Sequence, residues 1–224
     1  MFLYETHMHT STVSACAIST PAEQVFAYKK KGYTGVIITD HFINGNAHNT
    51  GRMPWADKMR FFISGYEKAV AAGKNCNLDV FLGWEYTIGG HDFLTYGLDM
   101  QFLLAHPSVA AMEIKQYSAL VRKNGGYLAQ AHPYRQGFWI NDPRPVDPKF
   151  LDGVEVHNNQ MPDSVNRKAY TFAQKHNLPM QAGSDSHDAE QRYFSGIKLR
   201  EKAKTIHDII KALKANESEL IIPS

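Results

Sequence analysis

Residues 34–41 read TGVIITDH and combine a strand signal with two side chains that can bind a metal ion or carry a proton. The run from Val36 to Thr39 is β-branched, which favours a strand buried on both faces, as in a parallel sheet. Asp40 and His41 follow at the carboxyl end of that strand. In α/β proteins, functional groups gather at the carboxyl ends of parallel strands. This stretch therefore predicts an α/β fold with ionisable side chains at one edge of its sheet.

Strand-like and helix-like segments alternate on both sides of this stretch, along the whole chain. Strands are predicted at residues 2–7, 34–41, 78–87, 92–98, 127–133, 153–159, 179–187 and 194–200, and helices at 19–32, 54–73, 107–126, 162–177 and 205–216. The first helix has the clearest start, with Ser19 or Thr20 as N-cap, Pro21 in the first turn and Glu23 three residues after Thr20. The alternation predicts parallel βαβ units, in an open sheet or a barrel, and one domain over residues 1–224.

The composition is that of an ordinary soluble globular protein. The 224 residues are 43% hydrophobic and 21% charged, and the net charge is +2 when the histidines are neutral. The sequence contains no basic run that would predict a surface for long nucleic acids. A local anion-binding pocket is compatible with this charge. Two cysteines in a chain of this length indicate a reducing interior, and the sequence shows neither the pattern of a signal peptide nor an apolar segment of about 20 residues. We therefore expect a cytoplasmic protein without a membrane partner. The composition predicts no oligomeric state.

Ligand-type side chains recur at the carboxyl ends of the predicted strands. They are His7 and His9, Asp40 and His41, Glu85, His132, His157, and Asp185 and His187, to which His91 in a short connection can be added. His7 and His9 are two residues apart and would face the same side of a strand. In a parallel barrel, all of these strand ends meet at one rim. A histidine can also cap a strand or satisfy a turn, and we prefer this interpretation for the histidines away from strand ends: His48, His106, His176 and His207.

The mixture of imidazoles and carboxylates indicates zinc, iron or manganese, because calcium and magnesium favour oxygen ligands alone. The set is larger than one tetrahedral ion requires, so we expect two or three divalent ions, with Glu85 or Asp185 as a bridge. Ions about 3.5–4 Å apart lower the pKa of bound water and hold the attacking and leaving oxygens of an in-line displacement. This chemistry favours the hydrolysis of a phosphoester.

The ordered motifs carry a family resemblance. Six motifs, in a fixed order, resemble those of the PHP family, the polymerase and histidinol phosphatase domains. They are HMHT (7–10), ITDH (38–41), GWE (83–85), AHP (131–133), EVH (155–157) and GSDSH (183–187). HMHT alone is a weak signal, whereas the ordered set ending in GSDSH is specific. The resemblance runs from His7 to His187 and so covers most of the chain. It implies a distorted (β/α)7 barrel, a trinuclear site of zinc, iron or manganese, and phosphoesterase activity.

Carried over position by position, the resemblance implies ligands for the first two ions. The family's ligands of one ion correspond here to His7, His9, Glu85 and Asp185. Glu85 would also bridge to a second ion, for which His132 matches the histidine of the AHP motif. His91 is the preferred remaining ligand of that second ion, and His157 is the lesser candidate.

For a third ion, the resemblance implies His41 and His187, with Asp40 close by as a ligand or proton carrier. Many family members supply a further Asp or His eight or nine residues after the first histidine, where this chain has Ala15 and Cys16. Cys16 could bind zinc as a thiolate, or it could be a small buried hydrophobe, the usual role of a lone cysteine. If Cys16 is not a ligand, the third ion is weakly bound or absent.

Two arginines are candidates for binding the phosphate: Arg135, shortly after AHP, and Arg192, beyond GSDSH. A guanidinium matches a phosphate bidentately, although each arginine could instead be a solvated surface side chain. Phe138 and Trp139, in the long loop after AHP, could stack on an aromatic leaving group or pack the loop down. For the hydrolysis itself, we expect a protonated Asp or His, with Asp40 and His187 as the candidates, to donate to the leaving oxygen.

We expect a small phosphomonoester, similar to histidinol phosphate or a nucleotide, as the substrate. A nuclease or cyclic phosphodiester hydrolase would use the same site, because a short nucleic acid needs little positive charge. A non-catalytic metal-binding module is a further alternative, although it would not need so complete a ligand set. An amidohydrolase also begins with HxH on a strand, but its site would ordinarily require a bridging lysine at a strand end. The predicted strand ends carry no lysine.

Overall fold

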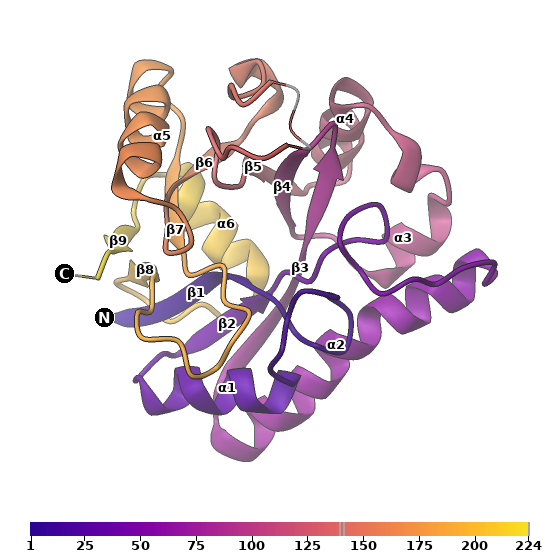
Figure 1. The fold of residues 1–224 in the computed structure, drawn as a ribbon. Coiled ribbons are helices and arrows are strands. Elements are labelled where there is room, and N and C mark those ends of the chain that lie inside the picture. Colours follow the sequence, from indigo (N-terminus) through magenta and orange to yellow (C-terminus); the bar gives the residue numbers. More distant parts are fainter. Residues whose placement is uncertain (139, 141, 224) are drawn as a thin grey trace.

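The strands of the protein join one curled sheet (Figure 1). The computed structural model describes residues 1–138, 140 and 142–223. The strands are β1 (Phe2–Met8), β2 (Gly35–Ile38), β3 (Asp79–Ile88), β4 (His91–Tyr96), β5 (Tyr127–Gln130), β6 (Gly153–Asn158), β7 (Met180–Gly183), β8 (Gly196–Leu199) and β9 (Glu219–Ile221). Their order across the sheet is β7-β6-β5-β4-β3-β2-β1-β8-β9. From β1 to β7, strands that are consecutive in the sequence are therefore neighbours in the sheet.

The sheet is nearly closed, because the residues after β7 lie against the carboxyl end of β1. The backbone N–H of His9 donates to the carbonyl oxygen of Ser186 at 2.8 Å, and the N–H of Ser186 donates to the carbonyl of His7 at 3.2 Å. The Thr6 hydroxyl donates to the carbonyl of Ala182 at 2.8 Å. The first residues of β1 pair instead with β8. The predicted α/β class and distorted (β/α)7 barrel are confirmed, with β1 to β7 as the barrel strands.

The prediction of parallel units throughout is wrong for β4 and β8, and β9 was not predicted. β1, β2 and β3 run parallel, as do β5, β6 and β7, but β4 is antiparallel to both of its neighbours, and β8 and β9 also pair antiparallel. β3 and β4 form a hairpin because Gly89 and Gly90, with φ angles of 58° and 86°, supply the positive φ values of a two-residue type I′ turn. The start of β4, rather than its end, therefore lies at the rim where the other barrel strands end.

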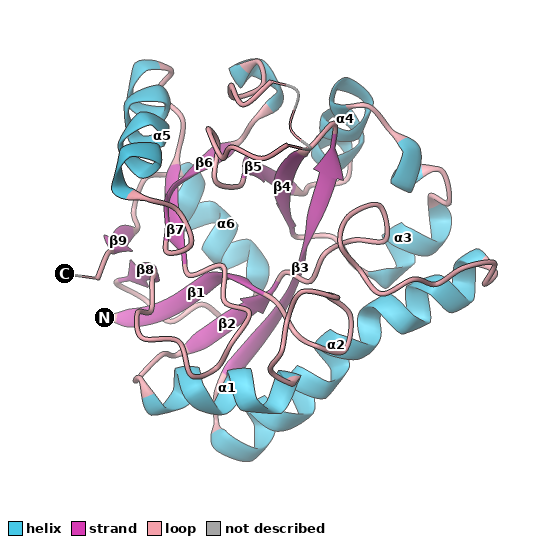
Figure 2. Ribbon diagram, in the orientation of Figure 1, coloured by secondary structure: helices cyan, strands magenta, loops and turns pink. Residues whose placement is uncertain are grey.

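Helices cover the outside of the sheet and one end of the barrel (Figure 2). They are α1 (Pro21–Lys30), α2 (Trp55–Cys76), α3 (Met100–Ala105), α4 (Ile114–Lys123), α5 (Asp163–Lys175) and α6 (Ile206–Lys214). α1 begins as predicted, since Thr20 and Glu23 form a reciprocal capping box at the start of the helix. The predicted helix at 107–126 is divided into a short 3-10 helix at Val109–Ala111 and α4, and α3 was not predicted. None of the helices in the described part of the chain combines the length and the apolar character that crossing a membrane requires.

The packing on the two faces of the sheet decides which side chains point into the barrel. At the end opposite the rim, α6 closes the barrel, and apolar side chains fill the space: Tyr4, Ile37, Leu94, Tyr96, Tyr127, Ile209, Ile210 and Leu213. On the outer face, Trp84 and Tyr86 of β3 are buried in the apolar core that the sheet shares with its helices. Side chains alternate along a strand, so Glu85 between them points into the barrel, above the apolar filling.

Candidate metal centre

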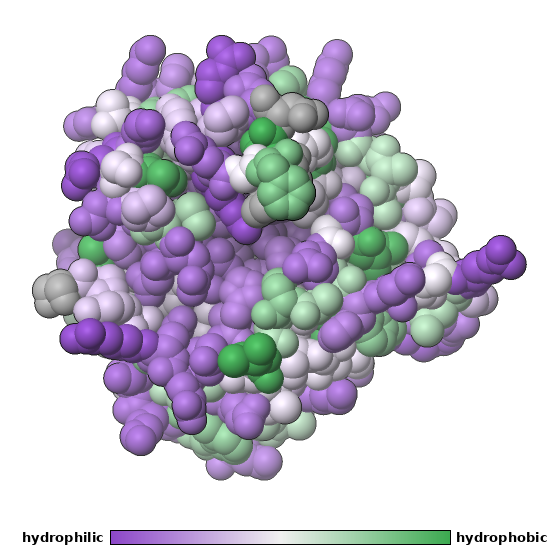
Figure 3. Space-filling model, viewed as in Figure 1, coloured by the Kyte–Doolittle hydropathy of each residue, from purple (hydrophilic) through white to green (hydrophobic). Residues whose placement is uncertain are grey.

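Ligand-type side chains from several strand ends meet at the rim of the barrel. The carboxyl ends of β1 and β2 lie near the middle of Figure 1, and the same region of Figure 3 is hollowed and lined by hydrophilic residues. The predicted ligands that meet here are His7, His9, His41, Glu85, His132, Asp185 and His187. All of them are buried except His187, which is half-buried. The structure groups them into three overlapping triads: His7–His9–Asp185, His7–Glu85–His132 and His9–His41–His187. The histidines expected to have other roles (His48, His106, His176 and His207) belong to none of these three.

The first group places two imidazole nitrogens face to face beside two carboxylates. His7 Nε2 lies 3.1 Å from His9 Nε2. Asp185 Oδ1 lies 3.1 Å from His9 Nε2 and 3.4 Å from His7 Nε2, and Glu85 Oε1 lies 3.3 Å from His7 Nε2. Donor atoms that converge in this way suit one divalent ion of the zinc, iron or manganese class. This is the set that the resemblance implied for a first ion.

Hydrogen bonds behind the two rings decide which nitrogen carries the proton. His7 Nδ1 lies 2.9 Å from Oε1 of Glu155, and an ionised carboxylate can only accept, so Nδ1 is the protonated nitrogen. The Ser14 hydroxyl donates to Asp40 Oδ1 at 2.8 Å, so its oxygen accepts from His9 Nδ1, 3.1 Å away. When the rings are neutral, the Nε2 atoms of both therefore direct lone pairs into the cluster. Metal-binding histidines are typically held from behind in this way.

Asp40 lies behind the cluster and outside it. Its Oδ1 accepts from the Thr10 backbone N–H at 2.6 Å, and its Oδ2 accepts from the Thr10 hydroxyl at 2.7 Å, in addition to the bond from Ser14. Burial raises the pKa of Asp40 to about 6, although these hydrogen bonds act to lower it. The structure does not place Asp40 where a ligand or a proton donor to substrate was predicted. Its carboxylate instead orients Ser14 and, through Ser14, His9.

The second group consists of His7, Glu85 and His132, and His132 Nε2 lies 3.0 Å from Glu85 Oε1. A further carboxylate, that of Asp92, lies beside this group and was not predicted from the sequence. Asp92 is buried, and its Oδ2 lies 3.9 Å from His132 Nε2. Asp92 therefore lies beside His132 at the edge of this group, although it belongs to none of the three triads.

The β3–β4 hairpin explains why Asp92, and not the predicted His91, faces the cluster. Glu85 and Thr87 are two residues apart in β3 and share a face. Asp92 is directly opposite Thr87, and opposite residues of an antiparallel pair also share a face. The Thr87 hydroxyl donates to Asp92 Oδ1 at 2.6 Å. His91 comes one residue earlier, and its Nδ1 lies 3.4 Å from Gln130 Nε2. Interpreting the paired glycines as a hairpin turn would have selected Asp92 from the sequence.

His157, the lesser candidate for the second ion, is turned away by a bulge in β6. Between Glu155 and His157 the register against β7 shifts, so the two side chains no longer share a face. His157 Nε2 lies 3.1 Å from Asn159 Oδ1, away from the cluster. Asn158 takes the inward position instead and donates to Glu155 Oε2 at 2.9 Å and to Asp185 Oδ2 at 3.2 Å. β6 therefore supports the ligands from behind.

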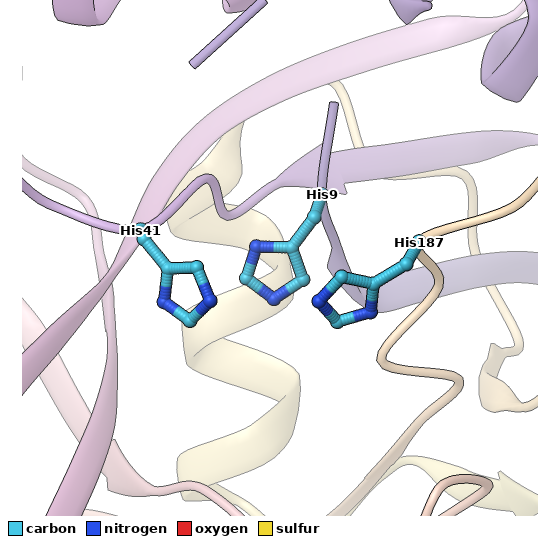
Figure 4. A group of neighbouring side chains, drawn as sticks. All are labelled: His9, His41 and His187. Carbon is cyan, nitrogen blue, oxygen red and sulfur yellow. The ribbon is translucent and has the colours of Figure 1, made fainter. Parts of the chain in front are cut away.

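The third group consists of imidazoles from three separate segments, whose rings project into the same space (Figure 4). These are His9, His41 and His187. His187 Nδ1 donates to the carbonyl oxygen of Asp185 at 2.8 Å, which leaves its Nε2 with a lone pair. That Nε2 lies 3.1 Å from Sγ of Cys16. Cys16 is exposed, so it is not the small buried hydrophobe of the second interpretation.

Two buried atoms at the centre of the cluster make no hydrogen bond with the described residues. His41 Nδ1 and Glu85 Oε2 lie 2.8 Å apart, but neither atom makes a hydrogen bond with the described residues. Burial raises the pKa of Glu85, but His41 and His7 outweigh burial and hold that pKa well below its ordinary value. Burial acts to raise the pKa of Asp185 as well, but His7 and His9 outweigh burial and hold this pKa well below its ordinary value. Divalent cations would compensate these ionised carboxylates, so the donor set fits metal binding.

The loop after β5 brings one of the two predicted phosphate-binding arginines to the edge of the cluster. Arg135 Nη1 lies 3.6 Å from Asp92 Oδ2, and its side chain is 32% exposed. Arg192 is exposed, and its guanidinium lies 5.1 Å from the ring centre of the next residue, a tyrosine. Phe138 is 98% exposed. Trp139 lies outside the described residues.

Glu155→Gln is expected to weaken binding of the first ion by about 10–100-fold, because the carboxylate that holds the His7 Nδ1 proton would be lost. Glutamine keeps the size of the side chain, so the fold should remain intact. Titration of the metal-free protein with Zn²⁺ measures the affinity, and circular dichroism checks the fold. Glu113→Gln, at an exposed position ahead of α4, is the matched control. The same affinity in both variants would remove this role from Glu155.

Comparison with known proteins adds a family match over part of the chain. Residues 163–218, from α5 through α6, match the model PHP_C, described as PHP-associated. This range includes the GSDSH motif, with Asp185 and His187. No curated protein matches the sequence.

The fold is shared with solved structures at low sequence identity. A two-domain protein from Bacteroides vulgatus containing a predicted PHP-like metal-dependent phosphoesterase is 15% identical, with a TM-score of 0.73; the match covers 99% of this chain and 64% of that chain. A provisionally assigned metal-dependent phosphoesterase from Bifidobacterium adolescentis is 17% identical, with a TM-score of 0.59 and 96% of both chains covered. A lesion-specific endonuclease from Pyrococcus furiosus is 13% identical, with a TM-score of 0.66, and the match covers 98% of this chain and 57% of that chain. The family match and the shared fold support the resemblance to the PHP family that the ordered motifs indicated.

Proposed function

We propose that this PHP-like chain is a metal-dependent phosphoesterase that hydrolyses a small phosphomonoester with two or three divalent ions of zinc, iron or manganese. The observation that carries the proposal is the pair of facing nitrogens, His7 Nε2 and His9 Nε2, 3.1 Å apart beside two carboxylates. Both rings are held from behind so that their lone pairs point at each other, an arrangement that is favourable when a cation lies between them. The fold shared with proteins assigned as phosphoesterases points the same way.

When bound, the ions would lower the pKa of a water molecule and hold the phosphate oxygens. Glu85 is suited to bridge the first two ions, because its Oε1 lies 3.0 Å from His132 Nε2 and its Oε2 lies 3.4 Å from His9 Nε2. Asp92, and not His91, is the further donor that we assign to the second ion. These side chains would fix the positions of the ions and therefore the position of the phosphate.

Arg135 is the residue that we propose binds the phosphate of the substrate. It lies at the edge of the cluster, is partly exposed, and already contacts a buried carboxylate through Nη1. A guanidinium can exchange such a contact for a bidentate pair with phosphate. Arg192, which is exposed and stacked on its neighbour, is the less favoured candidate. His187 suits a ligand better than a proton donor, because its Nδ1 proton is held by a carbonyl and its Nε2 carries a lone pair.

A nuclease or cyclic phosphodiester hydrolase is the second candidate function. The observation in its favour is the fold shared with the endonuclease from Pyrococcus furiosus. A net charge of +2 favours a short substrate over a long duplex. Both candidates use the same cluster and differ in the group that leaves the phosphorus.

Metal content and phosphate release test the proposal together. The purified protein is expected to contain divalent ions by elemental analysis and to release phosphate from at least one monoester in a panel of mononucleotides and histidinol phosphate. Removing the ions with a chelator should abolish the activity, and adding Zn²⁺, Fe²⁺ or Mn²⁺ should restore it. Short oligonucleotides and a cyclic dinucleotide in the same panel distinguish the second candidate. Correctly folded protein with neither bound metal nor turnover would refute both candidates.

A further inference from the structure

The loop between β1 and α1 holds a thiol at the edge of the cluster. Cys16 Sγ lies 3.1 Å from His187 Nε2, and the side chain is exposed. The backbone N–H groups of Ile18 and Ser19 both donate to the carbonyl of His187, at 2.9 and 3.3 Å. On the other side, the N–H of Ala15 donates to a carbonyl in the loop after β2 at 2.9 Å. Backbone hydrogen bonds on both sides of Cys16 therefore fix its thiol beside His187.

His9 cannot serve the first and the third ion at once. Its Nδ1 proton is held from behind, so only Nε2 has a free lone pair. That nitrogen lies 3.1 Å from His7 Nε2 and 3.1 Å from Asp185 Oδ1, which assigns it to the first ion. The third group is then left with two imidazoles, those of His41 and His187. Zinc sites that act on substrates usually have three protein ligands and an open fourth position.

We propose that Cys16 is the third protein ligand of that ion, so that His41, His187 and Cys16 form a sulfur- and nitrogen-donor zinc site beside two carboxylate-rich sites. The inference rests on the proposed function and decides between two and three ions. Binding would convert the thiol to a thiolate and release its proton to solvent. The position of Cys16 at the surface leaves the fourth coordination position open to water or a phosphate oxygen.

The donor sets predict different preferences among the ions. A thiolate is a soft ligand that zinc accepts well, whereas carboxylates also suit manganese. The carboxylates of Glu85, Asp185 and Asp92 lie in or beside the first two groups, whereas the third group consists of imidazoles, of which His41 also faces Glu85. His41 Nδ1 is buried and makes no hydrogen bond with the described residues, although Glu85 Oε2 lies 2.8 Å away, so this nitrogen is available to an ion. Zn²⁺ should therefore be retained at the third site when the other sites exchange it for Mn²⁺.

Cobalt spectroscopy and metal counting test this site directly. The full chain and its Cys16→Ser and Cys16→Asp variants are loaded with Zn²⁺ or Co²⁺, freed of excess ion and analysed for metal per chain. Three ions are expected in the unaltered protein and two in Cys16→Ser. The Co²⁺ protein should show thiolate-to-cobalt charge-transfer absorption, which both variants lose, although Cys16→Asp should regain the third ion. Cys76→Ser, in α2, is the matched control and should keep the ion count and the absorption.

Alkylation gives a readout that needs no activity. Zn²⁺ is expected to slow the reaction of Cys16 with iodoacetamide about tenfold or more, because a bound thiolate is a poorer nucleophile. Cys76 reports any general effect within the same molecule. An ion count in Cys16→Ser equal to that of the unaltered protein, or three Co²⁺ ions without the charge-transfer absorption, would overturn the inference. If every variant binds two ions and releases phosphate, only this inference fails. If none binds any ion, the proposed function fails with it.

Discussion

Asp185→Asn is expected to lower kcat/KM by at least about a thousandfold, equivalent to ~4 kcal/mol of lost transition-state stabilisation. Asp185 Oδ1 lies 3.1 Å from His9 Nε2 and 3.4 Å from His7 Nε2, so its charge sits where the first ion would bind. The residue has a φ of 51°, a left-handed conformation that asparagine also adopts readily. The substitution should therefore remove the charge without straining the backbone. Kinetics on the best monoester, together with metal content, measure the loss.

The matched control is a histidine at the other end of the barrel. His207 lies in the first turn of α6, the helix that closes the apolar end. His207→Ala should leave kcat/KM and metal content unchanged, whereas His9→Ala should behave like Asp185→Asn, because it removes a facing nitrogen. Equal losses in all three variants would show that the cluster is not the reaction centre.

Most of the cluster could be predicted because its members follow strong strand patterns. His41 comes directly after a β-branched run, and Asp185 and His187 follow the segment that forms β7. Parallel strands linked by helices bring their carboxyl ends to one rim, so side chains far apart in the sequence can be grouped without knowing a single contact. The two-residue spacing of His7 and His9 also fixed their shared face in advance.

The errors arise where the backbone departs from the regular pattern. The predicted parallel arrangement hid the reversal at β4, and with it the choice of Asp92 over His91. In β6, simple alternation would put Glu155 and His157 on one face, but the bulge separates them. Glu155 was also missed because its role depends on the closure of the sheet, which brings β6 behind His7. Neither closure nor a bulge leaves a local signal in the residues of the strand.

Glu85→Gln is expected to remove two ions at once, which separates it from Asp185→Asn. The Glu85 carboxylate lies 3.3 Å from His7 Nε2 in the first group and 3.0 Å from His132 Nε2 in the second. Asp185, by contrast, belongs to the first group and not to the second, so its loss should affect mainly the first ion. We expect activity in Glu85→Gln to fall to background, a loss of at least about a thousandfold. Zn²⁺ titration monitored by calorimetry should show two binding events lost in Glu85→Gln and one lost in Asp185→Asn.

The control for this comparison is an exposed carboxylate on the outside of the barrel. Glu67→Gln, on α2, changes the net charge by the same amount and should keep every binding event. Glu85→Asp retains the charge but shortens the side chain, so it should hold one of the two ions and lose the other. A Glu85→Gln protein that loses the same single ion as Asp185→Asn would show that Glu85 is not a bridge. The second ion would then be held by His132 and Asp92, whose ligand atoms lie 3.9 Å apart.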